Sequence, residues 1–192
     1  QASQSVYNLV GTAGSTTFAP IEILNGKTKM DEALAPMGDR KLLLNSRSGA
    51  AAVDARKGLF QSATAIGEQY KKGMIGTADG FDWMSNELLY THTNGNDVTG
   101  ATLNATATEA TASMALAGIT ANTGTVTKGT VFTVAGVNKV HPITKQATGV
   151  PQQFVVTALA TANGSGVAAV TVSPAMYTAT STGQQNIDAL PQ

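Results

Sequence analysis

The chain has 192 residues, a formal net charge of zero and no cysteine. A neutral chain lacks the electrostatic attraction that draws basic proteins to nucleic acid or anionic lipid. The absence of Cys excludes disulfides, Cys-based metal sites and Cys nucleophiles. No apolar run approaches the roughly 20 residues that cross a bilayer, so we expect no membrane partner.

Charge is distributed unevenly along the chain. Of the 12 Lys and Arg residues, nine lie before His92, and so do nine of the 12 Asp and Glu residues. The remainder is dominated by Thr, Ala, Val and Gly. This shift predicts two modules, joined by the Gly73–His92 stretch that contains the only Trp, Trp83.

The first half predicts a mixture of strands and helices. Pro20 suits a first helical turn, and the short apolar run Leu42–Leu44 is typical of a buried strand. The expected elements are a strand over residues 4–10, a helix from Pro20 to Leu34, a strand at Arg40–Asn45, a helix at Ala50–Ala55, a helix at Ala63–Lys72, and a loop running into a long strand within Gly73–His92.

The second half predicts an all-β module with short strands between Gly, Asn and Pro turns. The Ala/Thr-rich tract Val98–Ala112 is open to interpretation as a loop, an edge strand or a connection. The expected elements are a strand at Thr111–Ile119, a strand at Thr130–Ala135, a turn at Gly136–Asn138, a partner strand through Val140 and Ile143, a strand at Gln153–Leu159, a hairpin tip at Asn163–Gly166, and a strand at Val167–Ser173.

Five side chains are expected to form the core of this β module. They are β-branched or aromatic residues within the predicted strands. They are Phe132, Val134, Phe154, Val156 and Val170.

The candidates for chemistry are weak. His92 and His141 have no acidic residue at ligand spacing, so we expect no metal site. Asp79, Asp82 and Glu87 could form a carboxylate cluster for acid/base work or cation binding. However, Asp79-Gly80 is a common turn dipeptide, and Asp82 would face solvent if its neighbours pointed inward. We therefore expect no enzyme, no catalytic residue and no cofactor.

The aromatic residues around Trp83 allow two interpretations. Phe81, Trp83 and Tyr90 could form a stacking platform for a sugar or a base, or they could pack between the two modules. Aromatic side chains at a module junction are more often buried, so we expect inter-module packing.

Several blocks resemble the major capsid (coat) proteins of tailed bacteriophages of the short-tailed Salmonella phage type. In the second half, the blocks resemble the insertion domain of that family: Gly129–Lys145, Gln153–Ala158 and Val170–Met176. In the first half, Arg40–Asn45 and Gly76–Leu89 resemble the part that precedes the insertion.

The resemblance implies an α+β fold, namely part of the apical domain of the Hong Kong phage capsid fold with an inserted all-β Greek-key barrel. It assigns residues 1–92 to the apical domain, 93–180 to the inserted barrel and 181–192 to the return. The chain would be the central part of a coat protein.

The implied function is that of a major capsid subunit that self-assembles into an icosahedral head. Its partners would be further copies in pentamers and hexamers, scaffolding and portal proteins, and enclosed DNA bound without sequence specificity. Assembly would take place in the host bacterial cytoplasm, and the protein would reside in the virion capsid. The alternatives are a carbohydrate-binding or adhesin-like β module and a hydrolase supported only by scattered carboxylates.

Overall fold

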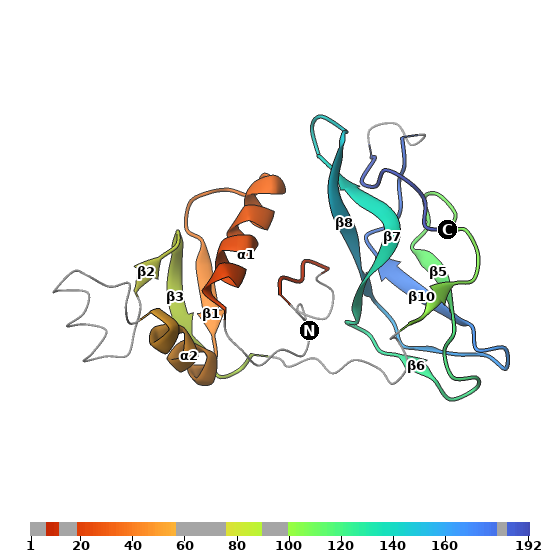
Figure 1. Ribbon diagram of the computed structural model, residues 1–192, viewed down its shortest axis with the longest axis horizontal. Coiled ribbons are helices and arrows are strands. Elements are labelled where there is room, and N and C mark those ends of the chain that lie inside the picture. Colours follow the sequence, from red (N-terminus) through yellow and green to blue (C-terminus); the bar gives the residue numbers. More distant parts are fainter. Residues whose placement is uncertain (1–6, 12–18, 57–75, 90–99, 180–183) are drawn as a thin grey trace. The chain divides into compact units, whose positions relative to one another are not determined.

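A computed structural model describes residues 7–11, 19–56, 76–89, 100–179 and 184–192 (Figure 1). The chain divides into two compact units, each considered by itself below. The α/β unit is Val10–Tyr90, and the β unit combines Gln1–Leu9 with Thr91–Gln192. Helices and sheets are both present, so the fold class is α+β.

The α/β unit contains two helices and a small mixed sheet. Helix α1 begins with Pro20, whose fixed φ angle suits a first helical turn. Strand β1 pairs in parallel with β3, and β2 pairs with β3 in antiparallel, giving the order β1-β3-β2. The elements are α1 (Pro20–Glu32), β1 (Lys41–Leu44), α2 (Ser46–Arg56), β2 (Thr77–Ala78) and β3 (Phe81–Ser85).

One face of this sheet forms the core of the unit. Phe81 and Trp83 lie on that face because strand side chains alternate, and they pack with Ile23 of α1 and Ala52 of α2. Leu42 and Leu44 of β1 pack against the same cluster. The intervening residues of both strands point the other way, and Leu43 and Met84 are exposed there.

The loop expected to run into a long strand over Gly73–His92 is found only in part among the described residues, because the strand that follows Asp79-Gly80 is the short β3. Residues 76–89 form a hairpin that was not expected, in which β2 pairs with β3. Asp79 and Gly80 both have positive φ, 56° and 81°, as a two-residue turn of this kind requires. The Asp-Gly dipeptide therefore reverses the chain before Phe81.

The β unit is all antiparallel in its named strands. A five-stranded sheet has the order β4-β5-β10-β8-β7, and β6 pairs with β9. The strands are β4 (Thr102–Leu103), β5 (Ser113–Ala117), β6 (Thr125–Val126), β7 (Val131–Val140), β8 (Ala147–Val156), β9 (Ala160–Thr161) and β10 (Ala168–Ser173).

The core of the β unit lies on the inner face of the five-stranded sheet. Met114 and Leu116 of β5 point into it, as the alternation in the sequence predicted. Val170 of β10 and Phe154 of β8 are fully buried in the same cluster. Ile187, near the end of the chain, adds a further fully buried side chain.

The hairpin between β7 and β8 differs from expectation. The predicted turn at Gly136–Asn138 is wrong, because β7 continues through these residues to Val140. Gly136, with a φ of 78°, lies where the register with β8 shifts between Thr133 and Asn138. A glycine with positive φ is typical of a β-bulge, which accounts for a turn signal inside a strand.

The actual reversal between these strands follows His141. The ring Nδ1 of His141 accepts hydrogen bonds from the backbone N–H groups of Ile143 and Thr144, at 3.3 and 3.2 Å. Lys145 has a φ of 57° and donates its N–H to the carbonyl of His141 at 3.0 Å. The expected partner strand through Val140 and Ile143 is therefore wrong.

Three further expected elements lie partly or wholly outside the described residues. No strand is present in residues 7–10, and the rest of the expected strand at 4–10 lies outside the described residues. The expected helix at Ala63–Lys72 also lies outside them. Within the Ala/Thr-rich tract, Thr102–Leu103 is the edge strand β4.

The expected domain ranges stay predictions, because they concern membership of a capsid fold. The chain's own division falls at residues 9/10 and 90/91, and it groups residues 184–192 with the β unit. The bridge between Lys139 of β7 and Ile187 lies within this unit.

Gly166 offers a test of turn packing in the β unit. Its φ is 72°, and a Cβ there would lie 2.6 Å from the carbonyl oxygen of Ile119. We expect Gly166→Ala to lower the free energy of unfolding by more than the roughly 1–3 kcal/mol of a strained backbone alone. Urea unfolding followed by circular dichroism measures the change.

The matched control is Gly136→Ala. Gly136 has a similar φ of 78° but no atom within 4 Å of an added Cβ. The alanine in this variant therefore has the same strained backbone angle but does not clash with a neighbouring atom. An equal decrease in the free energy of unfolding of the two variants would contradict the close packing of Gly166 against Ile119.

Candidate functional site

The aromatic pair predicted from the sequence lies inside the α/β unit. Phe81 and Trp83 are 6% and 9% exposed, too little for either ring to offer a stacking surface. The indole Nε1 of Trp83 donates a hydrogen bond to the carbonyl of Ala78, at 3.1 Å. Tyr90 lies outside the described residues. Packing of these residues between the two units stays a prediction.

A buried arginine covers the Trp83 ring. The guanidinium carbon of Arg56 lies 4.8 Å from the ring centroid, a distance at which a cation is attracted to the π face. Arg56 also forms an ion pair with Asp79 in the β2–β3 turn, and its side chain is 6% exposed. Arg56, at the end of α2, thereby contacts both the β2–β3 turn and the Trp83 ring of β3.

Asp79 is therefore part of an ion pair within the α/β unit as well as part of the Asp-Gly turn that the sequence indicated. The turn directs its side chain toward Arg56, and 21% of that side chain remains exposed. Sequence reasoning missed this pair because Arg56 and Asp79 belong to elements that only the tertiary fold brings together. The signals available were the Asp-Gly turn and a basic residue at a helix end.

The other carboxylates of the proposed cluster have separate local partners. Asp82 accepts a hydrogen bond from the hydroxyl of Thr77, its neighbour across the hairpin, at 2.7 Å. Glu87 accepts hydrogen bonds from the hydroxyl and the backbone N–H of Ser46 at the start of α2. These two bonds lower the pKa of Glu87 below its ordinary value. The arrangement caps a helix, as a carboxylate at a helix N-terminus can.

No metal site is present among the residues that the structure describes, since no group of three or more His, Asp or Glu side chains is suitably placed. His141 has its Nδ1 engaged in the β7–β8 turn. His92 lies outside the described residues. Neither described helix has the length and hydrophobicity of a bilayer-spanning segment.

The five predicted core residues of the β unit lie on three adjacent strands. Phe154, Val156 and Val170 are fully buried, whereas Phe132 and Val134 are partly buried and pack against the cluster. The rings of Phe132 and Phe154 face each other across β7 and β8, with centroids 6.0 Å apart and a tilt of 34°. Aromatic rings at this centroid distance attract each other beyond the effect of burial alone.

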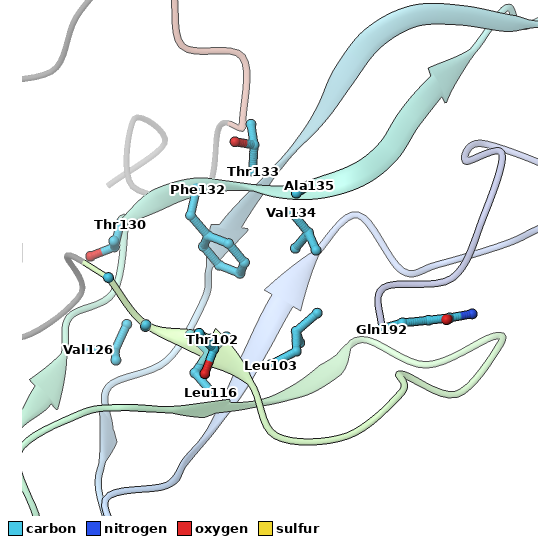
Figure 2. Close-up of a pocket in the computed structure, with 12 residues that line it drawn as sticks. Thr102, Leu103, Leu116, Val126, Thr130, Phe132, Thr133, Val134, Ala135 and Gln192 are labelled. Atoms are coloured by element: carbon cyan, nitrogen blue, oxygen red, sulfur yellow. The ribbon is translucent and has the colours of Figure 1, made fainter.

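A cavity of about 440 Å³ lies on the inner side of this sheet. Figure 2 shows the Phe132 ring of β7 and the side chains of Leu103 and Leu116, from β4 and β5, around it. Gln192 lies at its side (Figure 2). Sequence patterns do not indicate this space, because residues from β4, β5 and β7, which are distant along the chain, line it together.

Polar contacts that the sequence did not indicate fasten the last described segment to the β unit. Asp188 accepts hydrogen bonds from the backbone N–H and the side-chain Nδ2 of Asn138 in β7, both at 2.7 Å. Asn186 accepts from the N–H of Tyr177 at 2.9 Å and donates to the carbonyl of Ala175 at 2.7 Å. These amides and carboxylates position Ile187 in the core.

Neither a protein-family model nor a curated protein matches the chain. Among solved structures, the chain is similar to one described as the CUS-3 coat protein I-domain. The sequence identity is 26%, and the match covers 47% of this chain and 85% of that one. The TM-score is 0.30.

Asp188 predicts an acid dependence of stability. Burial acts to raise its pKa, but the hydrogen bonds from Asn138 and from the backbone N–H groups of Ala189 and Asp188 hold the pKa below its ordinary value. The unfolded chain therefore binds a proton more readily than the folded one. The stabilisation is complete above the unfolded pKa of about 3.9, and it is lost as the pH falls through the lower folded pKa.

We expect Asp188→Asn to lower the melting temperature at pH 7 and to narrow its gap to the wild type as the pH falls below about 4. Thermal unfolding between pH 7 and pH 2.5 measures the gap. Asp54→Asn, in helix α2, is the control for removal of a carboxylate elsewhere. A gap for Asp188→Asn that stays constant or widens with acid would contradict the role of its charge.

Proposed function

We propose that this chain is part of a phage coat protein, in which the α/β unit belongs to the shell and the β unit is the inserted domain. One observation carries the proposal. The five sequence blocks that resemble the capsid family lie in two sets of neighbouring strands, one set in each unit.

In the α/β unit, the block Arg40–Asn45 contains β1 and the block Gly76–Leu89 contains β2 and β3. β1 and β3 are hydrogen-bonded neighbours, with Leu42 in register with Trp83. In the β unit, the other three blocks contain the whole of β7, the last four residues of β8 and the last four residues of β10. These are consecutive strands of one sheet. Chance similarity in separate blocks gives no reason for this clustering.

The shell role consists of self-association into pentamers and hexamers around the genome, with scaffolding and portal proteins as assembly partners. This role requires rigid modules and contact surfaces rather than a catalytic centre. The buried Arg56–Asp79 pair and the carboxylate cap at Ser46 are structural uses of charge. They support a structural protein.

A carbohydrate-binding module is the alternative, and it requires exposed aromatic rings that can stack on a sugar. Phe81, Trp83 and Phe154 are buried, and Phe132 is partly buried against the core. Phe81 and Trp83, the described members of the platform considered from the sequence, therefore offer no stacking surface to a sugar.

The test is assembly of the complete native protein that contains this chain, followed by sedimentation and negative-stain electron microscopy. We expect closed shells from the wild type. We expect fewer or aberrant shells from Trp83→Ala, because loss of a buried aromatic side chain costs about 3–5 kcal/mol. Amide spectra should show that the β unit of this variant is still folded.

Asp82→Asn is the matched control, since it lies on the same strand, is not buried, and keeps an oxygen for the Thr77 hydroxyl. It should assemble as the wild type does. A wild-type protein that stays monomeric under all assembly conditions and binds glycans would contradict the proposed function.

A further inference from the structure

The cavity in the β unit lies between the two edges of the five-stranded sheet. β4 and β7 are the outermost strands in the order β4-β5-β10-β8-β7. Both contribute runs of four residues to the cavity wall, Gly100–Leu103 beside β4 and Phe132–Ala135 in β7. Figure 2 shows these two segments on opposite sides of the space. The sheet therefore curves until its edges face each other, but it does not close.

Runs of consecutive residues indicate that backbone lines the cavity. Side chains of successive strand residues point to opposite faces, so four in a row cannot all reach one space through their side chains. The four residues of each run lie along one edge of a strand, so their backbone atoms can all border the cavity. A run of this length corresponds to about 13 Å of extended chain.

The hydrogen-bonding pattern shows which groups of β7 face this gap. The carbonyl of Thr130 accepts from Val156 of β8 at 2.9 Å, so Thr130 and Phe132 direct their backbone groups to β8. Because these directions alternate in an antiparallel pair, the N–H and C=O groups of Val131 and Thr133 point away from β8.

The same pattern holds on the other edge. Asn104 donates its N–H to Ala115 at 2.9 Å, in register with the pairing of β4 and β5. The backbone groups of Leu103 and Ala101 therefore point away from β5. Ala101 and Leu103 on one edge and Thr133 on the other line the cavity, so outward peptide groups of both edges face it. Among the described strands, neither edge pairs with a further strand.

The chemistry of the wall restricts what such a strand can carry. None of the described residues that line the cavity is Asp, Glu, Lys or Arg. The wall combines apolar side chains, among them Leu103, Leu116 and Phe132, with Thr102, Thr130 and Thr133. A charged side chain placed there would lose water without gaining an ionic partner, which is costly. An uncharged occupant complements this lining.

We propose that the cavity is a strand-acceptor site: an extended, uncharged peptide segment of a partner protein inserts between β4 and β7 and closes the sheet. In this mode of recognition, main-chain hydrogen bonds supply affinity, and pockets for alternate side chains supply specificity. Leu116 and Phe132 offer the apolar pockets. The proposal rests on the β unit alone and does not depend on the capsid role.

The test uses a synthetic peptide of known chemistry, an acetylated and amidated copy of residues 168–173 (Ala-Ala-Val-Thr-Val-Ser). It is uncharged and alternates apolar with small or polar side chains. It is titrated into the isotope-labelled protein, and the amide resonances of Ala101, Leu103, Val131 and Thr133 are followed. We expect saturable shifts at both edges.

Thr133→Pro removes one outward N–H and is tolerated at an edge position, where proline breaks no bond to β8. We expect it to weaken peptide binding at least about tenfold, a difference of about 1.4 kcal/mol. Thr133→Ala keeps the N–H and is the matched control, with affinity within about twofold of the wild type. Circular dichroism establishes that both variants are folded.

A second arm leaves the protein unchanged. The same peptide methylated on the backbone nitrogens of its two valines cannot donate along one edge, and we expect it to bind at least about tenfold more weakly. A peptide with Lys in place of both valines should also fail.

Three results would overturn the proposal. They are the absence of saturable binding by the unmodified peptide, equal affinities for Thr133→Pro and Thr133→Ala, and equal binding of the methylated peptide. Binding of benzene at these amides without binding of the peptide would assign the space to small apolar molecules and would overturn it as well.

Discussion

The β unit depends on the insertion of β10 between β5 and β8. β10 is the last of the described strands along the chain, yet it occupies the centre of the five-stranded sheet. Its inward side chains, Ala168, Val170 and Val172, are at most 2% exposed, while Ala169 and Thr171 between them are exposed. Burial of each valine contributes about 1.5–3 kcal/mol.

This placement makes the sheet a non-local structure. β10 is in register with Met114 and Leu116 on one side and with Val155 and Val156 on the other. Until it inserts, β5 and the β7–β8 hairpin each have an unpaired inner edge. The chain reverses tightly between β9 and β10, and Gly166 and the hydrogen bonds that Asn163 accepts from the N–H groups of Ser165 and Val167 form this turn.

Local sequence patterns predicted those helices and strands whose conformation depends mainly on neighbouring residues. Pro20, the Leu42–Leu44 run and the alternation around Met114 each led to an element at the expected place, because helix starts and strand faces depend on near neighbours. Gly136 led to a wrong turn, because a positive-φ glycine serves a bulge as well as a reversal. The Asp79-Gly80 dipeptide indicated a turn, but the pairing of β2 with β3 across that turn was not predicted.

Local sequence patterns did not predict the long-range contacts. The Arg56–Asp79 pair, the Asn138–Asp188 pair and the cavity between β4 and β7 each join segments that are distant in sequence. The topology of the fold determines which of these distant segments come into contact. Of the predicted core residues, those on β8 and β10 lie deepest, whereas Phe132 and Val134 lie on an edge strand and are only partly buried.

Native-state hydrogen exchange of the β unit tests the central role of β10 most directly. Cooperative units exchange together, with free energies that rise toward the global value in the core. If β10 holds the sheet together, its amides should exchange most slowly, and those of β5 and β8 that pair with it should open in the same step. Protection of β5 or of the β7–β8 hairpin that persists after β10 has exchanged would contradict this account.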